Sequence, residues 1–391
     1  MSRRAVILVL DGVGAGEAPD AAAYGDVGSD TLGHVADAVG GLALPALERL
    51  GLGRARPLRG VRADVEPAAA WGLMLPASAG KDSTTGHWEL AGLHLERPFP
   101  TYPAGFPDAL VREFAERTGR PVIGNVVGSG TDVIAAYGPE HERTGAWILY
   151  TSADSVFQVA AHEAVVPLAE LHAACGTARR MLVAPHDVSR VIARPFIGGA
   201  GAYERTPNRR DYSIAPPGET LLDALAAAGI PRHGVGKTDD LFAGRNLAAE
   251  HTTGNADGLR RIRQWLGEAD GGLLFANLVD FDQLYGHRND AAGFHAALRE
   301  FDAALPGLLS LCREDDLLLI TADHGNDPTT ASTDHARERV PLLAAGPSVR
   351  PVALGTRPTF SDAGASVAEW LGVTFRGRGR SFVGDLLGGT A

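Results

Sequence analysis

Two separate stretches of the chain contain residues whose types and spacing suit phosphoryl transfer. Residues 323–327, with the sequence DHGND, offer carboxylate and imidazole groups directly after the apolar run 317–322. Residues 81–89, with the sequence KDSTTGHWE, offer three consecutive hydroxyl side chains. Carboxylates and imidazoles bind divalent ions, and a hydroxyl group bound to such an ion becomes a strong nucleophile. Together the two stretches predict a two-metal phosphoryl-transfer site.

Side chains of the metal-binding types recur at the ends of three apolar runs. One carboxylate follows 5–10, and a carboxylate and an imidazole lie in the loop after 272–279. Asp323 and His324 follow 317–322, and a further imidazole lies eleven residues after His324. A single histidine after a strand is usually a structural residue. Six such groups at three strand ends instead indicate a metal centre for Mn²⁺, Zn²⁺ or Mg²⁺. The predicted ligands are Asp11, Asp282, His287, Asp323, His324 and His335.

The hydroxyl cluster at 83–85 has two interpretations. Free backbone N–H groups and the positive dipole end at the start of a helix favour a bound phosphate group, which suits a nucleophile at this place. The alternative is an ordinary helix N-cap formed by Asp82 or Ser83. Composition alone does not choose among Ser83, Thr84 and Thr85 as the nucleophile.

Unbroken apolar runs alternate with helical patterns along much of the chain. Strands buried on both faces are predicted at 5–10, 272–279, 317–322 and 340–345, with a further strand-like segment at 71–75. Helices are predicted at 218–228, 257–265 and 291–311. This alternation is typical of an α/β fold with a mostly parallel sheet flanked by helices. Functional groups gather at the carboxyl ends of the strands in such sheets, so we expect the metal ligands to converge in one crevice.

The length of 391 residues predicts more than one domain. The segment 97–217 is rich in turns, and the proline clusters at both its edges suit linkers. Strand-like pieces within this segment are predicted at 146–151, 181–184 and 188–197. We therefore expect a smaller α+β domain at 97–217, inserted between two parts of a core domain at 1–96 and 218–391.

Composition narrows the class of protein and its compartment. A hydrophobic content of 45% with 21% charged residues indicates a folded, globular chain. The net charge of −11 and the lack of a dense basic stripe argue against nucleic-acid binding. Cys175 and Cys312 form no CxxC motif, which favours a cytoplasmic protein without disulfides. The apolar run that begins at residue 5 stops at Asp11, so it predicts a buried strand rather than a signal peptide, and no stretch predicts a membrane span.

In these motifs the chain resembles the phosphopentomutases of the alkaline phosphatase superfamily. The matching segments run in order along most of the chain: DGVG at 11–14, KDSTTGHWE at 81–89, TSADS at 151–155, RTPNR at 205–209, DFD at 280–282, GHR at 286–288 and ADHGNDPT at 322–329. The last segment is shared across the superfamily. Those at 81–89 and 205–209 are much more specific to phosphopentomutases.

The resemblance implies roles for individual residues. The family's nucleophile follows the motif's aspartate directly, which is Ser83 here, where the family commonly has threonine. One metal ion, usually manganese in this family, would be held by Asp11, Ser83, Asp323 and His324. The other would be held by Asp282, His287 and His335. The residues implied to bind substrate are Asp154 at the sugar hydroxyls, Arg205 and Lys237 at the distal phosphate, and Arg194 and Arg209 as further candidates.

The resemblance also implies the reaction. Ribose 1-phosphate and ribose 5-phosphate, or their 2-deoxy analogues, would interconvert through a phosphoserine and a bisphosphate intermediate, with a sugar bisphosphate as the phosphorylating activator. The expected partners are therefore pentose phosphates, and the oligomeric state is not predicted. The alternatives are a metal-dependent phosphatase or phosphodiesterase on the same core and a non-catalytic metal-binding protein. A cofactor-independent phosphoglycerate mutase is disfavoured by the arginine pattern and the shorter chain.

Overall fold

The computed structural model describes residues 2–152 and 154–388. The chain forms two compact units, one made of Met1–Arg97 with Pro216–Ala391 and the other of Pro98–Ala215. The predicted boundaries at 96/97 and 217/218 lie one and two residues from these junctions. Of the helices that the structure describes, none is long and apolar enough to cross a membrane.

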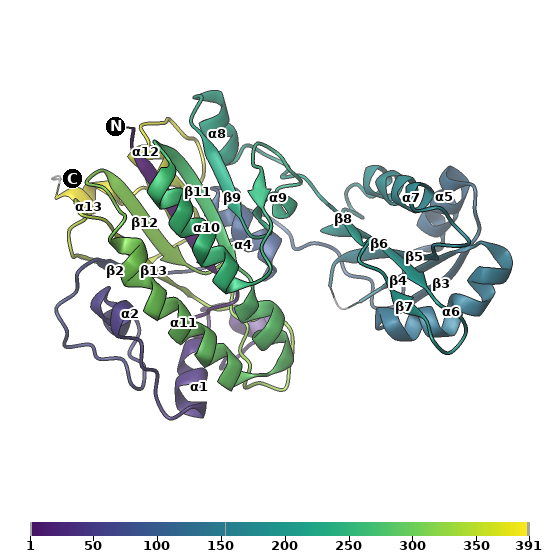
Figure 1. Ribbon diagram of the computed structural model, residues 1–391, viewed down its shortest axis with the longest axis horizontal. Coiled ribbons are helices and arrows are strands. Elements are labelled where there is room, and N and C mark those ends of the chain that lie inside the picture. The colour runs from purple at the N-terminus through teal and green to yellow at the C-terminus, as the bar shows by residue number, and fades with distance from the viewer. Residues whose placement is uncertain (1, 153, 389–391) are drawn as a thin grey trace. The chain divides into compact units, whose positions relative to one another are not determined.

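The larger unit is built on a mixed sheet with strand order β10-β9-β11-β1-β12-β13-β2-β14 (Figure 1). Its strands are β1 (Arg4–Leu10), β2 (Ala70–Met74), β9 (Arg232–Val235), β10 (Ala249–Glu250), β11 (Gly272–Leu278), β12 (Asp316–Thr321), β13 (Val340–Ala345) and β14 (Ala353–Arg357). All neighbouring strands run parallel except β13, which is antiparallel to both β12 and β2. This confirms the predicted α/β fold with a mostly parallel sheet.

The three central strands end at one level. Leu10 at the end of β1 pairs with Leu278 at the end of β11, and Val9 pairs with Thr321 at the end of β12. All three strands are buried along their whole length, which explains their unbroken apolar runs. The residues that follow them therefore emerge side by side at the carboxyl edge of the sheet.

Helices cover both faces of this sheet. One group contains α10 (Asn255–Glu268) and α11 (Ala291–Leu309), which pack together on the face turned to the viewer in Figure 1, with α1 (Thr31–Ala38) and α2 (Pro45–Arg49) against α11. The other group contains α4 (Ser83–Leu90), α8 (Leu221–Ala227), α9 (Thr238–Leu241) and α12 (Ser361–Trp370). Two short helices, α3 (Leu52–Ala55) and α13 (Val383–Leu387), complete the unit.

The smaller unit has a sheet and a core of its own. Its sheet contains β3 (Val122–Val127), β4 (Trp147–Thr151), β5 (Val156–His162), β6 (Arg190–Ile197), β7 (Glu204–Arg205) and β8 (Arg210–Ser213). Helices α5 (Asp108–Thr118) and α7 (Leu168–Met181) pack on one face and α6 (Gly130–Thr144) on the other (Figure 1). Separate apolar clusters fill the two interfaces.

One predicted strand of the smaller unit is wrong. Residues 181–184 form no strand: Met181 ends α7, and the N–H of Leu182 bonds to the carbonyl of Ala178 in the last helical turn. Both apolar side chains are buried in the cluster beneath α7. A short apolar run at the end of a helix has no periodicity that distinguishes it from a strand.

Candidate active site

The carboxyl edge of the central strands brings the predicted metal ligands together. Asp11 follows β1, Asp282 lies in the helical turn Phe281–Tyr285 after β11, and Asp323 and His324 follow β12. All four side chains are buried. Their convergence follows directly from the parallel pairing of the three strands.

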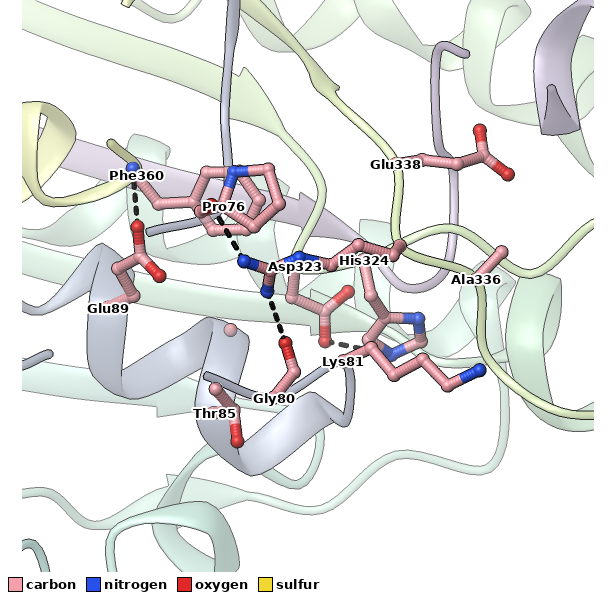
Figure 2. Close-up of a pocket in the computed structure, with 12 residues that line it drawn as sticks. Pro76, Gly80, Lys81, Thr85, Glu89, Asp323, His324, Ala336, Glu338 and Phe360 are labelled. Atoms are coloured by element: carbon pink, nitrogen blue, oxygen red, sulfur yellow. Dashed lines mark hydrogen bonds and ion pairs between the residues drawn. The ribbon is translucent and has the colours of Figure 1, made fainter. Parts of the chain in front are cut away.

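One group of ligands surrounds the imidazole of His324. Its Nε2 atom lies 3.1 Å from Ser83 Oγ, 3.3 Å from Asp11 Oδ1 and 3.4 Å from Asp323 Oδ2. Figure 2 shows the Asp323 carboxylate and the His324 ring facing each other beside the loop that carries Lys81. The four residues predicted to hold one ion therefore offer an atom each within a small volume.

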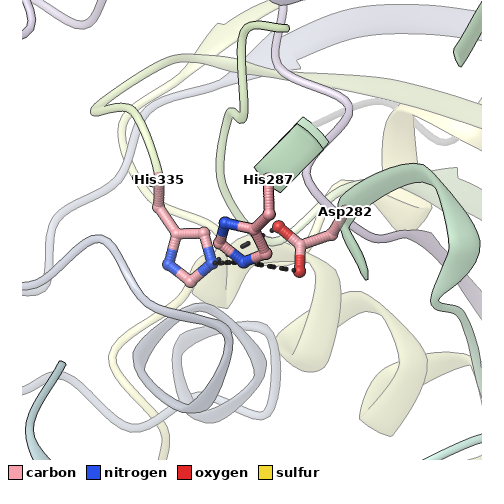
Figure 3. A group of neighbouring side chains, drawn as sticks. All are labelled: Asp282, His287 and His335. Carbon is pink, nitrogen blue, oxygen red and sulfur yellow. Dashed lines mark hydrogen bonds and ion pairs between the residues drawn. The ribbon is translucent and has the colours of Figure 1, made fainter. Parts of the chain in front are cut away.

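The second group is formed by Asp282, His287 and His335 (Figure 3). His287 Nε2 lies 3.1 Å from Asp282 Oδ2, His335 Nε2 lies 3.3 Å from Asp282 Oδ1, and the two Nε2 atoms are 3.2 Å apart. The Nδ1 atom of His287 is 2.6 Å from the carbonyl of Thr333, so it donates there and leaves Nε2 free to bind a metal. The rings of His324 and His335 are 4.0 Å apart, so the two groups adjoin.

The buried carboxylates fit a bound cation. Asp11 Oδ1 and Asp323 Oδ2 are inaccessible to solvent and accept no well-directed hydrogen bond from the described residues. Because buried oxygens of this kind are costly unless a donor or a cation compensates them, the donor set suits divalent ions. Carboxylate, imidazole and hydroxyl ligands are the types that Mn²⁺ and Zn²⁺ accept.

The pKa values reflect the crowding of charges. Burial, together with the nearby charges of Asp323 and Asp282, raises the pKa of Asp11. Burial would also raise the pKa of Asp282, but the neighbouring histidines, His335 foremost, hold it well below its usual range. Burial would lower the pKa of His324, but the carboxylates of Asp323, Asp11 and Asp282 together raise it well above its usual value.

Two of the three hydroxyl groups at the start of α4 have different neighbours. Asp82 is the N-cap, and its carboxylate accepts hydrogen bonds from the backbone N–H of Thr85 at 3.1 Å and from the hydroxyl of Thr85 at 2.5 Å. Ser83 is the first residue of the helix, and its hydroxyl lies beside His324. The N-cap is therefore Asp82, and the candidate nucleophile Ser83 is the adjacent residue.

Sequence reasoning missed several residues that hold the ligands in place. Asn277 Nδ2 donates to Asp11 Oδ2 at 2.9 Å, and Asn326 Nδ2 donates to Asp282 Oδ1 at 2.6 Å. Asn277 is a polar residue inside the apolar strand β11, a signal that could have identified it. The Nδ1 atom of His87 lies 2.9 Å from the carbonyl oxygen of Ser83 and 3.1 Å from Asp323 Oδ2, so this buried ring connects α4 to the metal ligands.

The predicted substrate residues are divided between the two units. Asp154, Arg194 and Arg209 line one hollow of about 190 Å³ in the smaller unit. Burial and the neighbouring charge of Arg209 lower the pKa of Arg194. Among the described residues that line the hollow, Arg205 is absent, and it lies on the short strand β7. Lys237 belongs to the larger unit and donates to the side chain of Gln283.

The same hollow contains groups that were not predicted. Arg190 and Ile192 line it with Arg194, because alternate residues of β6 share one face of the sheet. Residues 128–130, at the start of α6, also line it. Two arginines four residues apart in a strand are the signal that could have pointed to Arg190.

The chain is similar to known proteins along nearly its whole length. The family model described as the Metalloenzyme superfamily matches residues 3–374. The chain is 53% identical over 388 residues to a phosphopentomutase of Desulfitobacterium hafniense, covering 98% of this chain and 100% of the relative. It is 56% identical over 375 residues to a phosphopentomutase of Anaeromyxobacter sp. strain K, covering 95% and 96%. The solved structure of Leishmania mexicana phosphoglycerate mutase at low cobalt concentration aligns with a TM-score of 0.50 at 12% identity, covering 97% of each chain, which shows a shared fold.

Proposed function

Because the chain belongs to the phosphopentomutase family and is therefore a phosphomutase, an isomerase, we propose that it interconverts ribose 1-phosphate and ribose 5-phosphate and their 2-deoxy analogues. The observation that carries this proposal is the position of Ser83 Oγ, 3.1 Å from His324 Nε2 and at the first residue of α4. A hydroxyl group at this place faces the metal ligands and the free N–H groups of a helix start, which together favour a phosphorylated side chain.

Ser83 exchanges the phosphoryl group in this proposal. Phosphorylated Ser83 transfers its group to the free hydroxyl of the pentose phosphate: the new P–O bond to the sugar forms as the P–O bond to Ser83 breaks. The resulting bisphosphate reorients and returns its other phosphoryl group to Ser83. Each cycle restores the phosphoserine, so a sugar bisphosphate is needed only to phosphorylate the enzyme initially.

The ligand groups have assigned places in this scheme. When bound, two divalent ions, proposed to be Mn²⁺, stabilise negative charge on the transferring group and on the Ser83 oxygen. One ion is assigned to Asp11, Ser83, Asp323 and His324, and the other to Asp282, His287 and His335. Asn277 and Asn326 orient Asp11 and Asp282 through the hydrogen bonds described above.

Substrate binding is assigned to the charged residues of both units. In the smaller unit, Asp154 is assigned to sugar hydroxyl groups and Arg205 to phosphate, with Arg194 and Arg209 as further candidates. In the larger unit, Lys237 is assigned to phosphate. The shared hollow of Asp154, Arg194 and Arg209 supports this assignment, because arginine side chains bind phosphate through paired N–H groups.

A coupled assay distinguishes this function from the alternatives. Protein loaded with Mn²⁺ and primed with a sugar bisphosphate is given ribose 1-phosphate, and in parallel an aryl phosphate. We expect fast formation of ribose 5-phosphate with little aryl-phosphate hydrolysis, and the Ser83→Ala variant is the matched inactive control. Hydrolysis of the aryl phosphate without isomerisation would instead identify a phosphatase, and metal binding without either activity a non-catalytic protein.

A further inference from the structure

The side chain of Arg337 is bonded to the loop that precedes α4. This guanidinium is buried, with the residue 2% exposed. Its Nη1 atom donates to the carbonyls of Ser78 and Gly80, both at 2.6 Å, and Nη2 donates to the carbonyl of Pro76 at 3.0 Å. Figure 2 draws the bonds to Pro76 and Gly80. The fourth partner is the Asp20 carboxylate, 2.9 Å from Nη2, which balances the charge.

The same loop is held from its N–H side by a buried carboxylate. Glu89 accepts hydrogen bonds from the backbone N–H of Ala77 at 2.9 Å and of Ser78 at 2.7 Å. Three carbonyls of residues 76–80 thus accept from a guanidinium, and two N–H groups of the same loop donate to a carboxylate. The chain continues from this clamped loop into the N-cap Asp82 and then Ser83, so the position of the loop sets the start of α4.

The backbone of Arg337 belongs to the metal-binding side of the site. Arg337 follows His335 by two residues. The intervening Ala336 exchanges two backbone hydrogen bonds, of 3.0 and 2.7 Å, with Gly325, the residue after His324. The N–H of Arg337 donates to Asp26 at 2.8 Å, and the same carboxylate is 3.0 Å from Lys81 Nζ. Residues 335–337 therefore contact both ligand groups and the nucleophile loop.

We propose that Arg337 is a positioning residue that keeps Ser83 in register with the metal ligands. The inference rests on the proposed function of Ser83. A guanidinium has five N–H donors in a rigid fork, which lets one side chain hold three carbonyls and a carboxylate at once. Lysine retains the charge but has a single ammonium, so it leaves some of these carbonyls without a donor and loosens the loop. Misplacement of a reacting group by about 1 Å lowers a rate by roughly 100-fold.

The test compares two matched lysine substitutions in the full chain. Arg337→Lys removes the fork at the site. Arg4→Lys removes a similar buried fork at the opposite end of β1, where Arg4 pairs with Asp316 and donates to the carbonyls of Leu266 and Leu311. We expect both variants to lose thermal stability, and only Arg337→Lys to lose kcat, by at least about 10-fold with KM for ribose 1-phosphate changed by less than about 2-fold. Metal content should stay at the wild-type level in both.

Equal loss of kcat in the two variants, or wild-type kcat in Arg337→Lys, would overturn the proposal and leave Arg337 a stabilising residue. Should Arg337→Lys fail to fold, Asp20→Asn loosens the guanidinium without removing it, and must lower kcat by at least about 3-fold; unchanged kcat counts against the proposal. Amide hydrogen exchange at residues 80–86 reports how firmly this segment is held and does not depend on activity. It must be faster in Arg337→Lys than in Arg4→Lys. Wild-type protein without isomerase activity would contradict the proposed function, whereas the exchange comparison would still decide the role of Arg337.

Discussion

Histidine protonation connects metal binding at this site to pH. Burial alone would lower the pKa of His287, but its hydrogen bond to Asp282 and the charge of that carboxylate raise it to about 9. The pKa of His324 is also raised, by Asp323, Asp11 and Asp282 against the effect of burial. The His287 ring is therefore protonated at neutral pH when no metal is bound, and the direction of the shift favours the protonated form of His324 as well. A metal ion must displace these protons, because only a neutral imidazole is a ligand.

We predict that metal affinity rises with pH up to about 9 and that binding releases protons. Metal ions and protons compete for the same imidazole nitrogens. Below the raised pKa values, lowering the pH by one unit therefore weakens the apparent metal affinity by about tenfold for each proton that must leave. Titration calorimetry with Mn²⁺ in two buffers of different ionisation enthalpy measures the protons released. His287→Ala should reduce that number.

The control for this prediction is His251→Ala. His251 lies with Asp239 and Asp240 in a more exposed group of potential ligands to which no function is assigned here. Its removal should leave both affinity and proton release unchanged. Affinity that is independent of pH between 6 and 9 would show that His287 and His324 are not ligands.

At the residue scale the sequence predicted the candidate metal ligands but not the residues that hydrogen-bond to them. Asp11, Asp282 and Asp323 were recognisable because they follow buried strands. The choice of Ser83 over its neighbours came from the family resemblance, and the structure adds a physical reason, since Thr85 is bonded to Asp82. Arg337 was not recognisable, because its partners are backbone carbonyls more than 250 residues away and backbone carbonyls have no sequence signature.

At the element scale, the approach of α4 to the end of β12 depends on one glycine. A Cβ atom on Gly86 would lie 2.1 Å from the carbonyl oxygen of Asp323. That contact is with backbone, which cannot turn aside as a flexible side chain would. The helix therefore lies on the residue that follows the strand, and this close packing brings Ser83 near His324.

We predict that Gly86→Ala is destabilising although alanine favours helices. Overpacking at such a contact typically costs 1–3 kcal/mol, roughly, and here it should also lower kcat by displacing Ser83. The matched control is Gly267→Ala in α10, where a Cβ atom would have no neighbour within 4 Å. It should gain up to about 1 kcal/mol of unfolding free energy in urea and keep full activity. A Gly86→Ala protein as stable and active as the wild type would contradict this packing.

The elements themselves were largely predictable where burial was complete. Strands β1, β11 and β12 are covered on both faces, so their unbroken apolar runs predicted buried strands. The direction of β13 was not predictable, because an apolar run has the same pattern in parallel and antiparallel sheets. The short strands β9 and β10 have few buried apolar residues, so they gave no signal.

At the scale of the whole molecule, the smaller unit is one continuous segment with its own cores. The cluster beneath α5 and α7 includes Phe114, Trp147 and Phe157, and the cluster beneath α6 includes Ile148 and Phe196. A segment that buries this much apolar surface internally satisfies the criterion for an independent domain. The turn-rich composition and the flanking prolines predict such an insertion at 97–217, and the next experiment tests it.

We predict that a fragment of residues 98–215 folds on its own. It should unfold cooperatively on heating and show near-ultraviolet circular dichroism from the buried Trp147. Phe157→Ala in the same fragment should lose roughly 3–5 kcal/mol of unfolding free energy, because the buried ring packs against Phe106 and Phe114. A fragment with helical signal but no near-ultraviolet signal and no cooperative transition would refute its independence.

The central claim is that Ser83 carries the phosphoryl group, and peptide mapping by mass spectrometry tests it most directly. Wild-type protein incubated with a sugar bisphosphate and Mn²⁺ is digested, and the peptide that contains residues 81–89 is sequenced. We predict phosphate on Ser83, no phosphopeptide and no isomerisation in a folded Ser83→Ala variant, and substantial activity in Ser83→Thr. Phosphate on Thr84 or Thr85 in the wild type, or a Ser83→Ala variant that still interconverts pentose phosphates, would contradict it.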